Sequence, residues 1–461
     1  MTEDALASRS AAAPRRGLSA PQLAALSFVV LIAIGTIGLL ALPGLYTGEP
    51  LNWVDALFMA TSAVCVTGLV VVDVSRELTF WGQAWLLLLI QAGGLGILTL
   101  AGLVVSLSGV RMGLEVQEAA GGSTSVLPPR AAARMLRTAV GFTFVLEAAG
   151  ALALWLAWRG DVGAARAAWL AVFHSVSAFC NAGFSLFSDS LVGFRERPAL
   201  VLTVALLIVV GGLGFPVIQD LRYRLRGHHP HLTLHTRLVL VATAVLLAGS
   251  TLLYLLFEWN HELHPLGLLD RSLNAFFMAV TARTAGFNTV DYDLVSNPSL
   301  FLTLGLMWIG GGPASVAGGV KITTAALLGL LLWSRLSGDD HISLAGRTVP
   351  KETVQRATGL AAGAVLLLGV LLFFLLVTES GGAHWADRSQ LVRLVFEVQS
   401  AFSTVGLSMG ATPELTPAGR LVLVPAMVLG RIGPLIVLAA MAARQRRRLR
   451  FRYAHEDVIV G

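Results

Sequence analysis

Charged residues are scarce in this chain of 461 residues: Asp, Glu, Lys and Arg make up 13% of it, against about 25% in ordinary soluble proteins. Hydrophobic residues make up 55%, and the mean hydropathy is +0.74. So few charges do not cover the surface of water-soluble domains of this size, which excludes a soluble globular protein. The lipid bilayer is therefore the expected solvent for most of the chain.

Cysteine is also rare, since Cys65 and Cys180 are the only two. This excludes a disulfide framework and a cysteine-rich metal site, and redox chemistry is not expected. Glycine, in contrast, is abundant, with 48 residues. That content is high even for transmembrane helices, and it indicates close backbone contacts or unusual backbone conformations.

Eight apolar segments are long enough to cross a bilayer. They occupy residues 23–45, 80–108, 135–158, 198–221, 236–258, 299–334, 354–377 and 418–443. The first is longer than the roughly 7–15 apolar residues of a signal peptide core, which predicts a retained span. Basic residues collect in alternate connections and in the tail, around 15–16, 111–137, 222–237, 335–356 and 444–452. The positive-inside rule therefore predicts that both termini are cytoplasmic.

Each of the other connections contains a shorter apolar piece, at residues 54–66, 168–180, 271–283 and 391–403. About a dozen residues are too few to cross a hydrocarbon core of about 30 Å, so these pieces predict re-entrant helices that enter from outside. The order of span, re-entrant helix and span then recurs four times. The predicted fold is an all-α polytopic membrane protein: four membrane-pore-membrane repeats, with eight spans and four re-entrant pore helices, surround one pore in a pseudo-fourfold arrangement.

The boundaries of the predicted units follow from these segments. They are a cytoplasmic N-terminal segment (1–22), repeat 1 (23–108), a cytoplasmic linker (109–134), repeat 2 (135–221), a cytoplasmic loop (222–235), repeat 3 (236–334), a second cytoplasmic loop (335–353), repeat 4 (354–443) and a basic cytoplasmic tail (444–461). Only repeat 3 is predicted to have a broken second span.

The four re-entrant pieces align without gaps on one glycine each, followed by Leu or Phe. The glycines are Gly68, Gly183, Gly286 and Gly406, and a phenylalanine stands ten residues before each, at Phe58, Phe173, Phe276 and Phe396. A single glycine in a membrane segment more often marks close helix packing. Four in one register indicate a shared function instead, whereas the phenylalanines are expected to pack the pore helices.

Backbone that is not helical exists at membrane depth only where protein buries it or where it lines a water-filled path. Rings of four carbonyl oxygens replace the water around an alkali cation, and glycine permits the conformations that turn carbonyls inward. The partial negative charge at the end of each preceding helix also favours a cation. The predicted filter binds its metal ion by backbone carbonyls only and comprises Cys65, Val66, Thr67, Gly68, Cys180, Asn181, Ala182, Gly183, Arg283, Thr284, Ala285, Gly286, Ser403, Thr404, Val405 and Gly406.

A glycine-rich stretch, Gly310–Gly319, interrupts the second span of repeat 3. In a helix each of its five glycines costs about 1 kcal/mol relative to alanine and its proline about 3 kcal/mol, so the helix is predicted to break beneath the filter. A kink for packing is the alternative. Lys321 follows directly, and it either faces the pore or extends to the cytoplasmic interface.

Two arginines stand where a charge is costly. Arg431 lies in Gly430–Pro434, far from both ends of the last span, so a functional role is expected, with an acidic partner between helices as the alternative. Arg283, three residues before Gly286, is expected to point away from the pore and brace the filter by hydrogen bonds. Cys65 and Cys180 at the equivalent positions are expected to be small fillers behind the filter.

The aligned glycines, the glycine-rich stretch and Arg431 resemble those of the Trk, Ktr and HKT superfamily of potassium transporters, over about residues 22–461. The resemblance implies a potassium pore in each monomer and a homodimer in a bacterial inner membrane. It also implies potassium selectivity, because Gly68 stands where some plant members have serine and conduct sodium. With about 22 residues before its first span, the chain is most similar to the shorter, KtrB-like subunits.

The resemblance also implies how ion passage is controlled. The gate is expected to comprise Gly310, Gly311, Gly312, Pro313, Ala314, Ser315, Gly318, Gly319, Lys321 and Arg431. Regulation is expected from a cytosolic RCK-type (KtrA-like) ring that binds ATP or ADP and docks on the basic cytoplasmic face. This chain itself is expected to bind potassium as the transported ion but no cofactor and no nucleic acid, with sodium as a candidate activator.

Two other functions remain open from the sequence. A polytopic secondary carrier for another small solute would use the broken helix as its midplane site, although a carrier usually has two related halves rather than four copies. An intramembrane hydrolase would use Ser315, but no histidine or lysine is clearly placed to activate it. No catalytic residue is therefore predicted.

Other polar residues each have two interpretations. Four lie in apolar surroundings and either join helices or stabilise cations: Gln91, Glu147, His174 and Glu397. Three carboxylates follow their glycines by five or six residues, at Asp73, Asp189 and Asp291. They either concentrate cations at an outer mouth or simply make exposed loops polar.

Overall fold

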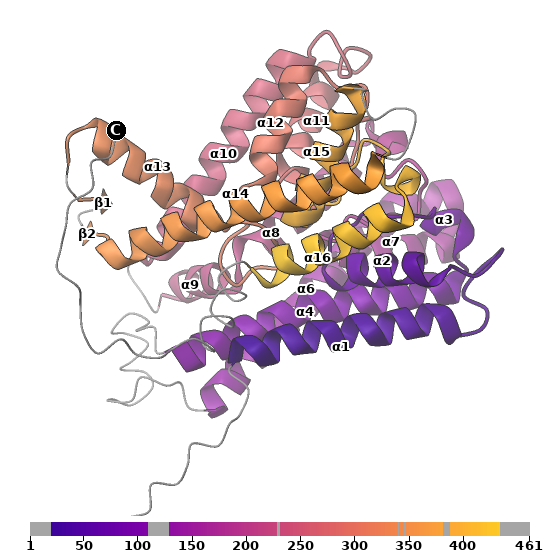
Figure 1. Ribbon diagram of the computed structural model, residues 1–461, viewed down its shortest axis with the longest axis horizontal. Coiled ribbons are helices and arrows are strands. Elements are labelled where there is room, and N and C mark those ends of the chain that lie inside the picture. The colour runs from indigo at the N-terminus through magenta and orange to yellow at the C-terminus, as the bar shows by residue number, and fades with distance from the viewer. Residues whose placement is uncertain are drawn as a thin grey trace, which may run out of the picture.

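The computed structural model describes residues 20–108, 129–227, 231–339, 341–344, 347–380 and 388–433, and it is mostly helical (Figure 1). The predicted basic tail and most of the N-terminal segment and of the 109–134 linker lie outside the described residues. The helices are α1 (Ala20–Ala41), α2 (Trp53–Val64), α3 (Val74–Glu77), α4 (Phe80–Ser108), α6 (Pro129–Val162), α7 (Ala164–Phe179), α8 (Pro198–Leu213), α9 (Phe215–Leu225), α10 (Leu234–Glu258), α11 (Leu268–Thr281), α12 (Asn297–Met307), α13 (Ile322–Leu336), α14 (Lys351–Glu379), α15 (Arg388–Ser403) and α16 (Pro417–Ile432). Two 3-10 turns (Val192–Phe194 and Thr412–Glu414) and a hairpin of β1 (Ser343–Leu344) and β2 (Arg347–Thr348) complete the described elements.

Local chemistry explains where several helices begin. Proline stands in the first turn of α8, α12 and α16, where its missing N–H group needs no partner. The side chains of Asn52, Thr233 and Thr416 accept hydrogen bonds from the first turns of α2, α10 and α16. These caps fix the starts of elements whose largely apolar sequences contain few other boundary signals.

By length and composition, three helices of the described residues can cross a membrane. They are α10, α14 and the part of α6 from Arg137 to Val162. A fourth span is possible if α8 and α9 form one, but these helices meet at an angle of 97°. The prediction of an uninterrupted span over 198–221 is therefore wrong. The helix breaks at Gly214, whose φ of +93° is not helical, and Pro216 follows in the first turn of α9.

The short helices α2, α7, α11 and α15 occupy equivalent places in the packing. Each packs against the long helix before it in the chain, which is α1, α6, α10 or α14. A long helix, its short helix and the helix that follows form one set. Each short helix also packs against a helix of another set: α4 contacts α7, α8 contacts α11, α12 contacts α15, and α16 contacts α2. The last contact returns to the first short helix, so the four sets close into a ring.

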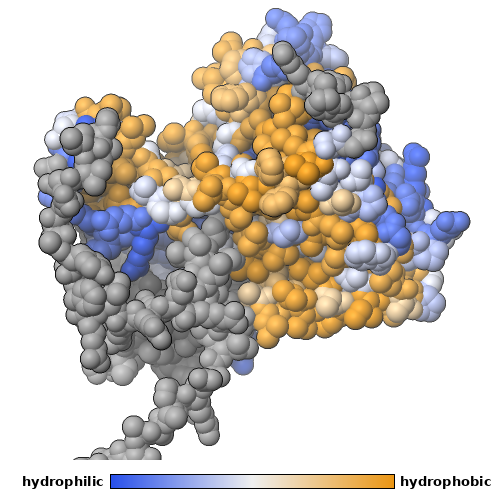
Figure 2. All heavy atoms as spheres, viewed as in Figure 1, coloured by the Kyte–Doolittle hydropathy of each residue, from blue (hydrophilic) through white to orange (hydrophobic). Residues whose placement is uncertain are grey.

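The outer surface is apolar to an extent that water does not favour. Hydrophobic residues cover most of the coloured part of the face shown in Figure 2, and hydrophilic residues gather at its top and right edges and beside the grey atoms on the left. Large apolar side chains on the long helices α10 and α14, such as Leu252 and Leu366, are about 70% exposed (68% and 71%). A continuous exposed surface of this kind is what a bilayer covers.

The four aligned phenylalanines pack within the helical core. Phe58, Phe173 and Phe396 are 0% exposed, and Phe276 is partly buried while the next residue, Phe277, is 0% exposed. Their aromatic rings fill space around the short helices, as expected from the sequence.

An ion pair joins the first short helix, α2, to the last helix, α16, where the ring closes. Asp55 in the first turn of α2 binds Arg420 in the first turn of α16, which also donates to the carbonyl of Pro413 at 2.7 Å. The side chains are only 12% and 15% exposed. Asn52 supports the carboxylate of Asp55 through its amide group at 2.8 Å. The pair therefore closes the contact between helices that are 365 residues apart along the chain.

We expect Asp55→Asn to lower the free energy of unfolding by about 2–3 kcal/mol, because it leaves the guanidinium of Arg420 largely buried without a counter-charge. Thermal unfolding of the detergent-solubilised chain measures the effect. The matched control is Asp161→Asn, whose partner Arg197 forms a well-exposed pair (38% and 52% exposed) and whose loss is expected to cost less than about 1 kcal/mol. Equal effects of the two substitutions would contradict the role of the pair in closing the ring.

Candidate functional site

The four glycine segments, residues 65–68, 180–183, 283–286 and 403–406, lie at the C-terminal ends of α2, α7, α11 and α15. In each, the glycine has positive φ, between +69° and +95°. The residue two places earlier also has positive φ: Val66 (+55°), Asn181 (+57°), Thr284 (+69°) and Thr404 (+49°). A left-handed backbone costs a non-glycine residue about 1–3 kcal/mol, and β-branched residues rarely adopt it. The same strained position in all four segments indicates one shared geometry.

The four glycines meet one another in a closed ring. A Cβ atom added to any of them would lie within 3 Å of the carbonyl oxygen of the residue that precedes the next glycine in the ring. The pairs are Gly68 with Ala182 (2.5 Å), Gly183 with Ala285 (2.9 Å), Gly286 with Val405 (2.6 Å) and Gly406 with Thr67 (2.1 Å). No side chain fits at these positions, and the ring alternates glycine backbone with carbonyl oxygen.

Serine side chains hold two of the glycines. Ser62 and Ser400, at the starts of the aligned motifs, accept hydrogen bonds from the N–H groups of Gly68 (3.1 Å) and Gly406 (3.0 Å). In the second segment Ser177 instead donates to the carbonyl of Phe184 at 2.8 Å. In the third, where valine replaces serine, Thr281 one residue later donates to the carbonyl of Phe287 at 2.5 Å. The hydroxyl groups therefore hold the backbone at the glycine itself in the first and fourth segments and at the residue after the glycine in the second and third.

Three threonine hydroxyls within the segments have no hydrogen-bond partner among the described residues. They belong to Thr67, Thr284 and Thr404, and all three side chains are 0% exposed. A buried hydroxyl without a partner costs about 1–3 kcal/mol. Their oxygen lone pairs are thus free beside the ring of carbonyls.

Arg283 differs from its counterparts in the other segments. Its guanidinium donates to the carbonyl of Gly310 at 3.4 Å, and its Nε has no partner among the described residues. The side chain is 8% exposed and lines a small cavity with Asn181, Thr243 and Gly311. The arginine thus extends to the glycine-rich stretch, and the ion pairs among the described residues include none to it.

The two cysteines lie in buried surroundings. Cys180 Sγ is 3.5 Å from Gln91 Oε1 and 3.9 Å from Glu147 Oε1, and Gln91 donates to Glu147 at 3.1 Å. These bonds join α4, α6 and the end of α7. No group of three or more His, Cys, Asp or Glu side chains suited to a metal ion occurs in the part of the chain that the structure describes. Gln91 and Glu147 thus join helices, which was one of their two predicted roles.

The glycine-rich stretch Gly310–Gly319 is not helical and lies between α12 and α13. It folds back on itself through a hydrogen bond from Gly310 N to Val320 O at 2.9 Å. It also binds the break between α8 and α9, since Gly312 N donates to Gly212 O (2.8 Å) and Phe215 N donates to Ala314 O (3.1 Å). The two interrupted helices therefore satisfy each other's open backbone groups.

The stretch also contacts the fourth glycine segment. A Cβ atom on Gly318 would lie 1.9 Å from Thr404 Oγ1, and one on Gly319 would lie 3.4 Å from Ser403 O. Ser315, Val316 and Ala317 between the helices are 1–2% exposed. The glycine-rich stretch is thus packed directly against the ring of segments.

Arg431 binds this stretch. Its guanidinium donates to the carbonyl of Val316 and, at 3.4 Å, to that of Gly93, and the side chain is 3% exposed. The ion pairs of the described residues include none to Arg431, so the alternative of an acidic partner gains no support. Lys321 donates to the carbonyl of Ala317 at 2.6 Å, so it turns back to the same stretch.

A second set of aligned glycines, Gly93, Gly211 and Gly430, was not recognised from the sequence. Gly93, Gly211 and Gly430 each stand where a Cβ atom would lie 1.7–2.1 Å from the carbonyl oxygen four residues before a ring glycine, at Val64, Phe179 or Phe402. Gly94 and Gly212 follow the first two, whereas Arg431 follows the third. Alignment of the second spans on these glycines would have shown an arginine at a glycine position.

Ser315 has no activating partner in the described residues. Its hydroxyl accepts a hydrogen bond from Ala317 N at 3.3 Å, while the amino group of Lys321 is engaged by the carbonyl of Ala317. The serine thus shapes a turn of the glycine-rich stretch.

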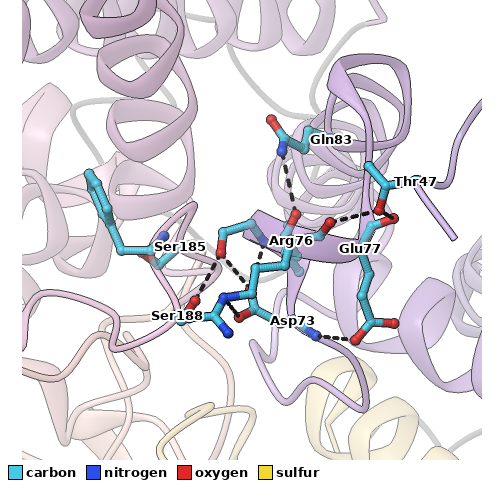
Figure 3. A network of polar contacts seen from close by, with 10 residues as sticks. Thr47, Asp73, Arg76, Glu77, Gln83, Ser185 and Ser188 are labelled. Atoms are coloured by element: carbon cyan, nitrogen blue, oxygen red, sulfur yellow. Dashed lines mark hydrogen bonds and ion pairs between the residues drawn. The ribbon is translucent and has the colours of Figure 1, made fainter. Parts of the chain in front are cut away.

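The three loop aspartates all cap backbone groups. Asp189 accepts from Gly193 N (3.0 Å), Asp291 from Asp293 N (3.0 Å) and Asp73 from Ser75 N (2.8 Å). Figure 3 shows Asp73 within a network that reaches the loop of Ser188 through the hydroxyl of Ser75. Burial raises the pKa of Asp73, but its interactions with Ser188 and Ser75 outweigh burial and hold the pKa below its ordinary value.

Comparison with known proteins adds to this geometry. A family model described as "Cation transport protein" (TrkH) matches residues 10–448. The Ktr system potassium uptake protein B of Vibrio alginolyticus is 38% identical over 96% of this chain and 95% of that protein. The potassium/sodium uptake protein NtpJ of Enterococcus hirae is 36% identical over 97% of this chain and 98% of that protein.

A solved structure shares the fold. The potassium transporter TrkH from Vibrio parahaemolyticus superposes with a TM-score of 0.74 at 22% identity, covering 94% of this chain and 87% of that one. The family match extends over most of the chain, and the relatives exceed 30% identity over nearly all of it. The chain therefore belongs to the TrkH family of cation transport proteins.

Proposed function

We propose that this chain takes up potassium ions through a pore at the centre of four membrane-pore-membrane repeats. The observation that carries the proposal is the closed ring of four glycines alternating with four carbonyl oxygens. Relatives named as potassium uptake proteins support the choice of ion. The family consists of transporters and not enzymes, so hydrolysis at Ser315 is not proposed.

The glycine segments act as the selectivity filter in this proposal. Cys65 has φ −77°, Val66 has +55° and Gly68 has +95°, so left-handed residues interrupt the normal backbone. Such interruptions turn carbonyl groups toward one side, where a ring of oxygens replaces the hydration shell of a cation. The hydroxyl oxygens of Thr67, Thr284 and Thr404 have no hydrogen-bond partner among the described residues, so they are available as further oxygen ligands for a cation. The C-terminal ends of the four short helices, which carry a partial negative charge, lie next to the glycine segments.

The glycine-rich stretch with Arg431 acts as the gate. It packs against Thr404 and fixes the carbonyl of Val316 to a buried guanidinium, which adds a positive charge beneath a cation filter. An unpaired cation there repels a permeating cation strongly because the surroundings have a low dielectric constant. Release of the stretch from Arg431 would open the path.

The assembly around the pore is part of the same proposal. The chain forms a homodimer in a bacterial inner membrane with cytoplasmic termini, and a cytosolic RCK-type ring controls the gate by binding ATP or ADP. Family membership and the basic residues of α9, Arg222 and Arg224, which suit an acidic partner surface, support this arrangement.

Uptake of rubidium or potassium into liposomes that contain the purified chain tests the function, with sodium as the competing ion. Potassium-selective uptake that saturates is the expected result. Absence of cation flux both with and without a nucleotide-binding ring would overturn the pore. In that case a secondary carrier for another solute becomes the better hypothesis.

We expect Gly68→Ser to lower the potassium-to-sodium uptake ratio about tenfold, which corresponds to about 1.4 kcal/mol. The new Cβ atom would lie 2.5 Å from the carbonyl oxygen of Ala182, so the oxygen ring must widen or tilt. Competition flux in liposomes measures the ratio. Gly249→Ser is the matched control, because Gly249 faces open space on α10 and its substitution is expected to leave the ratio unchanged. A native ratio in the Gly68 variant would contradict the filter.

We expect Arg431→Ala to raise basal potassium flux severalfold, because it removes the buried charge and the bond to Val316. Flux through the chain alone, without a regulatory ring, measures this effect. Arg356→Ala on exposed α14 is the control, and its basal flux is expected to equal that of the native chain. Arg431→Lys keeps the charge but not the paired hydrogen bonds, so it separates the two contributions. Unchanged basal flux in the alanine variant would argue against the gate.

A further inference from the structure

Two of the four short helices carry a buried titratable side chain at the same position. His174 on α7 and Glu397 on α15 each stand nine residues before the ring glycine, and both are 0% exposed. Met59 and Phe277 take this position on α2 and α11. Since the ring contacts run from Gly68 to Gly183, Gly286 and Gly406 in turn, the helices with His174 and Glu397 lie diagonally opposite.

His174 binds the backbone that leaves its glycine segment. Its Nδ1 donates to the carbonyl of Leu170 at 2.8 Å, so in the neutral ring Nε2 is an acceptor. Nε2 lies 3.0 Å from Ser185 Oγ and accepts from Leu186 N at 3.4 Å. Ser185 is the second residue after Gly183. The imidazole is enclosed by aromatic rings, with Trp158 at 5.1 Å between centroids, and the side chain is 0% exposed.

Glu397 makes the equivalent contact on the opposite side. Its Oε1 accepts from Ser408 Oγ at 2.8 Å and also from Thr412 Oγ1. Ser408 is the second residue after Gly406, as Ser185 is after Gly183. Two different acceptors, an imidazole and a carboxylate, thus hold serine hydroxyls at matching places. Val70 takes the matching place in the first segment and has no hydroxyl to offer.

The segment held by His174 also binds both neighbouring segments. Leu191 N donates to Asn288 O at 2.9 Å, and Ser190 Oγ accepts from Asn288 N at 3.2 Å. On the other side Ser188 Oγ lies 3.1 Å from Ser75 Oγ, a contact drawn in Figure 3. Asn288 is the second residue after Gly286. An anchor at His174 therefore restrains its own segment and, through these bonds, the chain that follows Gly68 and the chain that follows Gly286.

We propose that His174 and Glu397 are positioning residues that set ion selectivity, by fixing the backbone two residues beyond opposite glycines of the filter. This rests on the proposed potassium pore. Each glycine has wide conformational freedom on its own, so its carbonyl direction depends on the bonds that hold the chain beyond it. Ties on one diagonal suffice because contacts within the ring transmit the restraint to the other two segments.

The test replaces the acceptors without a large change in volume. His174→Leu and Glu397→Leu are each expected to lower the potassium-to-sodium uptake ratio at least fivefold while total cation flux persists. Glu397→Gln retains an acceptor oxygen and is expected to keep the ratio within twofold of native. Met59→Leu alters the same position on the other diagonal, where no hydrogen bond exists, and is expected to leave the ratio unchanged.

Two further variants, which remove the partner hydroxyls, keep the test decisive if the leucine variants do not fold. Ser185→Ala and Ser408→Ala remove only one oxygen each, and each is expected to shift the ratio in the same direction as the leucine variant on its side. Native ratios in the leucine variants, or in the alanine variants if the leucine variants do not fold, would overturn the positioning role while the pore remains. No potassium selectivity in the native chain would instead overturn the proposed function and this inference with it.

Discussion

The close approach of four glycine backbones is the constraint on which the rest of the structure depends. Because a Cβ atom at any of these positions would lie within 3 Å of a neighbouring carbonyl oxygen, each short helix must deliver its glycine at the same depth. The left-handed residues two places earlier add about 1–3 kcal/mol of strain each. Only dense packing around the segments holds such a backbone, and the buried phenylalanines Phe58, Phe173 and Phe396 supply part of it.

The positions of the four ring glycines could be predicted from the sequence, because the segments around them align without gaps and each contains one glycine at the same place. The positive φ of Val66, Thr284 and Thr404 could not, because the intrinsic preference of β-branched residues opposes it. Tertiary contacts override that preference here. Similarly, the interruption at Gly310–Gly319 was predicted from its composition, whereas the break at Gly214 was missed. There a single glycine bends the chain, and the open backbone groups find partners in Gly312 and Ala314, far away in sequence.

The surroundings of the buried cations were the least predictable part of the site. The sequence left an acidic partner for Arg431 open, and the structure provides backbone carbonyls instead, at Val316 and Gly93. Carbonyl partners leave no mark in a sequence, since every residue has one. For the same reason the contact of Arg283 with Gly310 could not be assigned beforehand. The proposed roles of these arginines therefore depend on backbone geometry that only the folded chain supplies.

The helices around the four glycine segments are not equivalent at every position. At the position after the helix glycine, Gly94 lies against the side chain of Cys180 and Gly212 against that of Asn181, while Arg431 extends a cation toward Val316. Val316 belongs to the non-helical stretch between α12 and α13, so in the proposed gate this stretch and α16 together obstruct the path. In the proposed gate the interruption after α12 and the arginine of α16 therefore act together, because they meet at the carbonyl of Val316.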